Sequence, residues 1–145
     1  MTIDGLSDDE VLAILKRVRA FAVVGASNKP HRPSNDVMRF LLEQGYLVEP
    51  VNPTIADEVI FGRKVHADLA AVPPPVDVID IFRTSDAVPE IVQDAIRLRE
   101  KLGASVIWMQ LGIVNEAAAA AARAHGFTVV MDRCPKIEFS RLLRG

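Results

Sequence analysis

Five short apolar runs alternate with helical patterns along this sequence. Each run has the length of a buried strand and is bounded by Gly, Pro or polar residues. The runs are "FAVVG" (21–25), "YLVEPVNP" (46–53), "VDVIDIF" (76–82), "SVIWMQLG" (105–112) and "FTVVMD" (127–132). Near-continuous apolar strands are typical of a parallel sheet that is covered on both faces. The alternation of these runs with helices therefore predicts a parallel sheet covered on both faces.

The segments between these runs have helical periodicity. An N-terminal helix is predicted to begin at a capping box formed by Ser7 and Glu10 and to end near Val18. Further helices are predicted over residues 34–45, 85–103, 115–126 and 136–143. Residues 54–75 lack a clear period, and we expect irregular chain with a short helix or turn there.

Right-handed crossovers between these elements give an α/β fold, a Rossmann-like doubly wound sheet of about five parallel strands with helices on both faces. The expected strand order is 3-2-1-4-5, with the ligand crevice beyond the carboxyl ends of strands one and four. The candidate functional loops are those that follow the strands, at residues 25–34, 52–53, 82–84, 110–112 and 132–135.

Length and charge limit the classes of function. The 145 residues fit a single domain, 1–145, with the helix in residues 1–19 packed on the edge or end of the sheet. A formal net charge of −2 argues against nucleic acid as the main partner. The one cysteine forms no intrachain disulfide, and no run approaches the length of a membrane span. We expect a cytoplasmic, soluble protein without a metal site; a protein partner is neither indicated nor excluded.

The loop after the first strand has the features of an anion site. Gly25 permits a sharp bend and a close approach of backbone to ligand, and Pro33 and Ser34 open a helix whose free amides attract negative charge. Lys29 and Arg32 add charged donors on the same loop. A polar loop can also be merely solvated, with Ser34 acting only as a helix cap.

A nicotinamide dinucleotide fits this loop poorly. The stretch "GASNKP" lacks the G-x-G-x-x-G pattern, and the second strand ends at Asn52 where an acidic ribose ligand would be expected. Glu49 lies inside that strand and is a weak substitute. No P-loop motif is present either. An NAD(P)-dependent oxidoreductase and a regulatory α/β module without a small ligand remain the alternatives.

Five motifs in register resemble a known family. The stretches "VVGASNKPHRPS", "VNP", "VDVIDIFR", "VIWMQLGI" and "MDRCPKIE" look like those of the stand-alone CoA-binding domain proteins. These are similar to the CoA-binding domain of the succinyl-CoA synthetase alpha subunit, and the resemblance extends from about Ala20 to the end of the chain. It implies a Rossmann-like domain that holds coenzyme A or an acyl-CoA as a small-molecule ligand. Ligase activity is not expected, because the synthetase's second domain and partner subunit have no counterpart here.

The resemblance also implies ligand-binding residues. The resemblance places the phosphates at Gly25, Ala26, Ser27, Pro33 and Ser34, with Lys29 and Arg32 as charge partners. It places the adenosine beside Val51, Asn52, Pro53, Phe82 and Arg83. The pantetheine arm would lie beside Gln110, Leu111 and Gly112. Asn52, Phe82 and Gln110 could equally be packing or turn residues.

No catalytic set of side chains is apparent, so we expect binding without a reaction and no catalytic residues. Cys134 is the one candidate nucleophile, with Arg133 and Lys136 as nearby cations. No histidine is fixed beside it by sequence, and the pantetheine end is expected nearer Gln110 than the sheet edge that the fifth strand occupies. We therefore interpret Cys134 as a packing residue. The alternative is a reactive thiol that forms a mixed disulfide with CoA or receives an acyl group.

Overall fold

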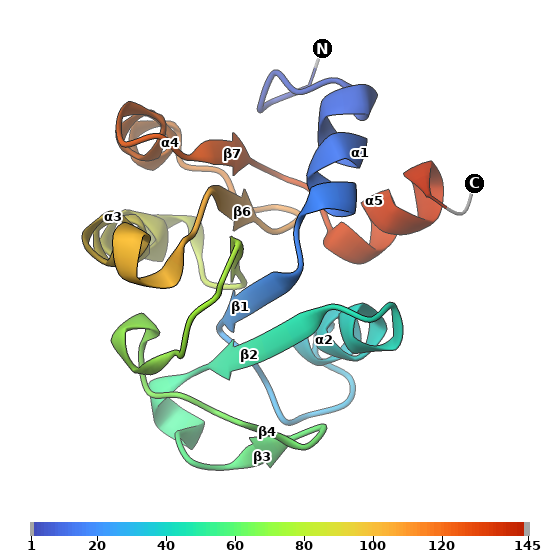
Figure 1. The fold of residues 1–145 in the computed structure, drawn as a ribbon, viewed down its shortest axis with the longest axis vertical. Coiled ribbons are helices and arrows are strands. Elements are labelled where there is room, and N and C mark those ends of the chain that lie inside the picture. The colour runs from blue at the N-terminus through green and yellow to red at the C-terminus, as the bar shows by residue number, and fades with distance from the viewer. Residues whose placement is uncertain (1, 144–145) are drawn as a thin grey trace.

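The computed structural model describes residues 2–143 and contains one central parallel sheet (Figure 1). All neighbouring strands of this sheet pair in parallel. Its strands are β1 (Ala20–Val24), β2 (Leu47–Val51), β5 (Val78–Ile81), β6 (Val106–Met109) and β7 (Thr128–Val130). The helices that connect them confirm the predicted Rossmann-like α/β fold.

The strand order differs from the prediction. It is β2-β1-β5-β6-β7, so the third apolar run pairs with β1 and does not lie at the outer edge beyond β2. The physical reason is that no long helix links β2 to β5. The intervening chain instead passes along the free edge of β2, where His66 forms a single parallel bridge with Val51. The winding therefore reverses between β1 and β5, and the ligand crevice is expected beyond these two strands.

Two layers of helices cover the sheet, one on each face (Figure 1). Helices α3 (Val88–Leu102) and α4 (Glu116–Ala124) pack on one face, with Ile79 and Ile107 in the same apolar cluster. Helices α1 (Asp8–Arg17), α2 (Pro33–Glu43) and α5 (Pro135–Leu142) cover the other face, where Trp108 is fully buried. Helix α1 thus packs on a face of the sheet, not on its edge or end, because its buried side chains join the cluster of α2. None of the helices in residues 2–143 is long and apolar enough to cross a bilayer.

The segment between β2 and β5 contains a hairpin that the sequence did not indicate. Strands β3 (Val59–Ile60) and β4 (Arg63–Lys64) pair antiparallel beyond β2, and short 3-10 helices flank them at Pro53–Ile55 and Leu69–Ala71 (Figure 1). A third 3-10 turn, Ser85–Ala87, precedes α3. Strands of two residues carry no readable period, which explains why the hairpin was missed.

A carboxyl group lies unpaired in the centre of the sheet. Asp80 on β5 is 0% exposed, and neither carboxylate oxygen has a hydrogen-bond partner among the described residues. Burial raises the pKa of Asp80 well above its ordinary value. The folded protein therefore holds a proton there that the unfolded chain releases above about pH 4, and stability falls as pH rises beyond that point.

Replacing Asp80 by asparagine should remove this pH dependence. We expect the Tm of Asp80→Asn to equal that of the wild type near pH 4 and to be several degrees higher than that of the wild type at pH 8. For a domain of this size, about 1 kcal/mol of unfolding free energy corresponds to about 4 °C in Tm. Calorimetric melting between these pH values measures the difference. Asp94→Asn on α3, where the side chain is 44% exposed, is the control. A constant difference between Asp80→Asn and the wild type at every pH would contradict a protonated Asp80.

Candidate functional site

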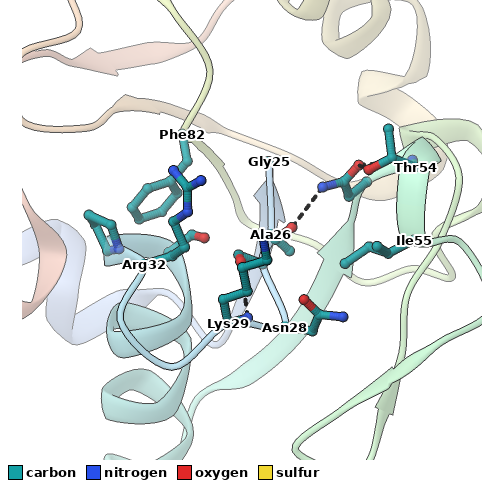
Figure 2. A pocket seen from close by; sticks show the side chains of 12 residues that line it. Gly25, Ala26, Asn28, Lys29, Arg32, Thr54, Ile55 and Phe82 are labelled. Atoms are coloured by element: carbon teal, nitrogen blue, oxygen red, sulfur yellow. Dashed lines mark hydrogen bonds between the residues drawn. The ribbon is translucent and has the colours of Figure 1, made fainter.

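The loop after β1 forms one wall of a pocket at the carboxyl ends of the strands (Figure 2). We call it the loop pocket; it has a volume of about 440 Å³. Lys29 and Arg32 come from this loop, Thr54 and Ile55 from the turn after β2, and Phe82 from the end of β5 (Figure 2). Its lining residues are Gly25, Ala26, Ser27, Asn28, Lys29, Arg32, Pro33, Ser34, Asn52, Thr54, Ile55 and Phe82.

Hydrogen bonds hold the start of this loop against β2. The amides of Gly25 and Ala26 both donate to the carbonyl of Val51, at 2.9 and 3.2 Å. The Asn52 side chain donates to the Ala26 carbonyl at 2.8 Å and accepts from the amide of Thr54 at 2.9 Å. Asn52 therefore positions the loop, and the two amides that Val51 engages are not available to a ligand.

The next part of the loop is pinned to α2. Asn35, which is buried, donates from its side chain to the carbonyl of Ser27 at 2.9 Å. The Ser27 hydroxyl accepts from the amide of Lys29 at 3.1 Å. These contacts hold the backbone of the loop in one conformation. The loop groups that remain available to a ligand are therefore preorganised.

The mouth of the loop pocket favours an anion. Helix α2 begins at Pro33, its N-cap residue is Arg32, and no side chain caps it. Pro33 has no N–H, and the amides of Asn35 and Asp36 donate to the Arg32 carbonyl at 3.1 and 3.2 Å, so the amide of Ser34 and the positive end of the dipole are what this helix start presents to the loop. Lys29 and Arg32 are exposed. Two exposed cations next to a helix N-terminus are suited to phosphate groups.

A second pocket adjoins the first. This apolar pocket has a volume of about 530 Å³ and shares Pro33 and Phe82 with the loop pocket. It lies between the ends of β5 and β6 and the start of α5. Its lining residues are Pro33, Asp36, Val37, Phe82, Gln110, Leu111, Ile113, Cys134, Lys136 and Ile137.

The charged groups at this pocket neutralise one another. Asp36 accepts from Lys136 at 2.8 Å and from Arg39 at 2.9 Å, and these two bonds hold the pKa of Asp36 below its ordinary value. The carboxylate therefore stays ionised and paired. Aliphatic and aromatic side chains form most of the remaining wall.

The structure brings most of the predicted residues together and separates a few. Gly25, Ala26, Ser27, Lys29, Arg32, Pro33, Ser34, Asn52 and Phe82 line the loop pocket, whereas Gln110 and Leu111 line the apolar pocket. The other predicted residues, Val51, Pro53, Arg83 and Gly112, line neither of these two pockets. Val51 is in the core, and the amide of Gly112 donates to Asp132 at 2.6 Å.

Several lining residues were missed by the sequence reasoning. Thr54 and Ile55 directly follow the predicted strand end, and Lys136 and Ile137 follow a predicted loop. These residues could have been predicted because each adjoins a loop that follows a strand. Cys134 and Gln110 lie on the same pocket, contrary to the expected separation of the fifth strand from the pantetheine end. Across residues 2–143, no three His, Cys, Asp or Glu side chains gather to form a metal site.

Comparison with known proteins gives consistent matches. The model of the CoA binding domain family matches residues 19–140. The Bacillus subtilis (strain 168) protein YneT is 37% identical over 131 residues, which cover 90% of this chain and 93% of YneT. A hypothetical protein from Pyrococcus horikoshii OT3 is 40% identical with a TM-score of 0.90, covering 99% of this chain and 96% of that one.

A larger enzyme contains a similar domain. Acetyl-coenzyme A synthetase 1 from Ca. Korarchaeum cryptofilum has 29% sequence identity and a TM-score of 0.68 over 83% of this chain. The match covers 28% of the synthetase chain, so the similarity is to one part of that protein.

Proposed function

Because the chain belongs to the CoA binding domain family, we propose that it binds coenzyme A or an acyl-CoA across the carboxyl ends of the sheet, without catalysing a reaction alone. The observation that carries the proposal is the pair of adjoining pockets. One is polar and cationic, the other is apolar, and they meet at Pro33 and Phe82. Coenzyme A has the same division, with phosphates at one end and a flexible pantetheine arm at the other.

In this arrangement, the first turn of α2 together with Lys29 and Arg32 holds the diphosphate. The pantetheine arm passes over Phe82 into the apolar pocket and ends near Gln110. Thr54 and Ile55 border the adenosine at the opposite wall of the loop pocket.

The surroundings of β2 argue against a nicotinamide dinucleotide. The residue at the strand end is Asn52, whose side chain is engaged by Ala26 and Thr54. Glu49, the acidic residue in β2, is bound by Arg63 at 2.9 Å and lies 2.6 Å from His66. It is therefore committed to the sheet edge, and a ribose would have to displace these partners.

Titration with a set of cofactors tests the proposal. CoA and acetyl-CoA should raise the Tm in a concentration-dependent way and give saturable heats in calorimetry, because a ligand of the folded state stabilises by about 2.7 kcal/mol at 100 times its Kd. NAD and NADP are expected to have no effect. Stabilisation by NAD or NADP but not by CoA would assign the site to a nicotinamide dinucleotide. If none of the four compounds stabilises the protein, the alternative of a regulatory α/β module without a small ligand is favoured.

The two loop cations should supply much of the affinity. Lys29→Ala and Arg32→Ala are each expected to weaken CoA binding by about tenfold, since a hydrogen bond to a charged group contributes about 1.5–3 kcal/mol. The double variant should also have a flatter salt dependence of the Kd, because exposed charges are screened by salt. Calorimetric titration at two ionic strengths measures both quantities.

Lys16→Ala is the matched control, because Lys16 is exposed near the end of α1, which leads into the amino end of β1 (Figure 1). It should leave affinity and salt dependence as in the wild type. Equal behaviour of the control and the double variant would mean that Lys29 and Arg32 do not contact the phosphates.

A further inference from the structure

We infer that Cys134 forms a reversible mixed disulfide with coenzyme A, so that CoA held in the two pockets becomes covalently attached under oxidising conditions; this rests on the proposed function. Cys134 is the only cysteine in the sequence. It stands at the N-cap position of α5 and lines the apolar pocket together with Phe82 and Gln110. The pantetheine thiol would arrive in the same pocket.

The Cys134 thiol has no evident capping role. At 7% exposure the residue is buried, and its side chain makes no capping hydrogen bond to α5. A reagent that reaches the sulfur has to enter the apolar pocket, so reactivity should depend on what that pocket admits. The free first-turn amides of α5 lie at the same end of the pocket and favour the negative charge that passes between sulfurs during exchange.

Gln110 gives a second, independent indication of a ligand in this pocket. The residue is 7% exposed, lines the pocket, and its side-chain oxygen has no hydrogen-bond partner among the described residues. An unsatisfied buried acceptor costs about 1–3 kcal/mol. The amide N–H groups of a pantetheine arm are donors of the kind that this oxygen lacks, and an arm bound there brings its thiol toward Cys134.

The backbone that carries Cys134 is held firmly against β6. Trp108 donates from its indole N–H to the carbonyl of Arg133 at 2.8 Å. The Arg133 guanidinium is in turn bound by Asp4 at 2.8 Å and by Glu138 at 2.7 Å. The backbone next to Cys134 is therefore held in place beside the pocket, as an exchange reaction with a bound partner requires.

The chemistry is thiol–disulfide exchange with oxidised CoA, the symmetric disulfide of two CoA molecules. The Cys134 thiolate attacks one sulfur of that disulfide, forming a Cys134–CoA bond while the original sulfur–sulfur bond breaks. The second CoA leaves as a thiolate and takes a proton from water, and the proton of Cys134 goes to solvent. No further oxidant is consumed, and a second thiol reverses the reaction.

Intact-protein mass spectrometry under non-reducing conditions tests the inference. Incubation with oxidised CoA should add one CoA less two hydrogens, and dithiothreitol should remove it. The rate should saturate with oxidised CoA and exceed by at least tenfold the rate with oxidised glutathione at equal concentration, because glutathione lacks the part that the loop pocket binds.

Variants distinguish a reaction that depends on CoA binding in the two pockets from a reaction that depends only on exposure of the thiol. Cys134→Ala should give no adduct, Lys29→Ala/Arg32→Ala should slow adduct formation at least tenfold, and Lys16→Ala should react as the wild type does. Equal rates with both disulfides, or no adduct in a protein that binds CoA when reduced, would overturn the inference. Calorimetry of the reduced protein with CoA judges the proposed function separately, since that measurement does not need the disulfide.

Discussion

Gly25→Ala is expected to weaken CoA binding by at least about tenfold, equivalent to about 1.4 kcal/mol, and to destabilise the protein by about 1–3 kcal/mol. Gly25 has a φ of +93°, which L side chains rarely adopt. A Cβ atom there would lie 3.1 Å from the carbonyl oxygen of Phe82 and 3.2 Å from Cδ of Arg83. To relieve these contacts, the loop or the end of β5 must move, and both form walls of the pockets.

Gly45→Ala is the control that distinguishes the effect of backbone strain from the effect of displacing neighbouring atoms. Gly45 also has a φ of +93°, but no heavy atom lies within 4 Å of the Cβ position, and it follows α2 on the far side from the loop pocket. It should lose comparable stability to backbone strain and keep the wild-type affinity. Chemical unfolding and calorimetric titration of both variants make the comparison. If folded Gly25→Ala binds CoA as tightly as the wild type does, the ligand does not approach this loop.

The general fold was predictable because it depends on strong local patterns. The apolar runs and the capping box at Ser7 specify the strands and helices nearly where the structure has them. The strand order was not predictable, because it depends on the path that residues 54–75 take between β2 and β5. A connection without a long helix can return on either side of β1, and local periodicity contains no information on that choice.

The same reasoning applies to the site. Strand ends identify the loops, since the carboxyl ends of parallel strands meet at one edge, and Gly25, Arg32, Phe82 and Gln110 were found in this way. Which loops meet across that edge depends on tertiary contacts. The approach of Cys134 to the apolar pocket follows from the Trp108–Arg133 hydrogen bond and from the buried ion pairs of Arg133, which no sequence period indicates.

Those ion pairs lead to the largest stability effect that we expect. Arg133→Met should cost about 3–5 kcal/mol of unfolding free energy, because removing one partner of a buried pair leaves the other charged and unpaired. The Asp4 side chain is 0% exposed and that of Glu138 is 8% exposed. The methionine replaces the length of the arginine but none of its donors.

The loss should depend on pH in a defined direction. Burial raises the pKa of Asp4, but hydrogen bonds from Arg133 and from the amides of Leu6 and Met131 outweigh it and hold that pKa below its ordinary value. In the wild type, this pairing stabilises the fold above about pH 4, and the contribution is lost as pH falls through the lowered pKa. Without Arg133, Glu138 keeps only Arg141 as a cationic partner, and Asp4 is neutralised only by protonation. The deficit of Arg133→Met should therefore be largest at neutral pH and smaller near pH 4.

Arg141→Met provides the matched comparison. Arg141 also binds Glu138, at 2.9 Å, and it pairs with Asp8 at 2.8 Å, but its side chain is 44% exposed. Water can replace those partners, so the loss should be much smaller than for Arg133→Met and should vary little with pH. Urea unfolding of both variants at pH 7 and pH 4 distinguishes the cases. Equal losses at both positions would mean that the Asp4–Arg133–Glu138 cluster is as well solvated as the surface, and the Cys134 backbone would then lack the rigid support on which its approach to the apolar pocket depends.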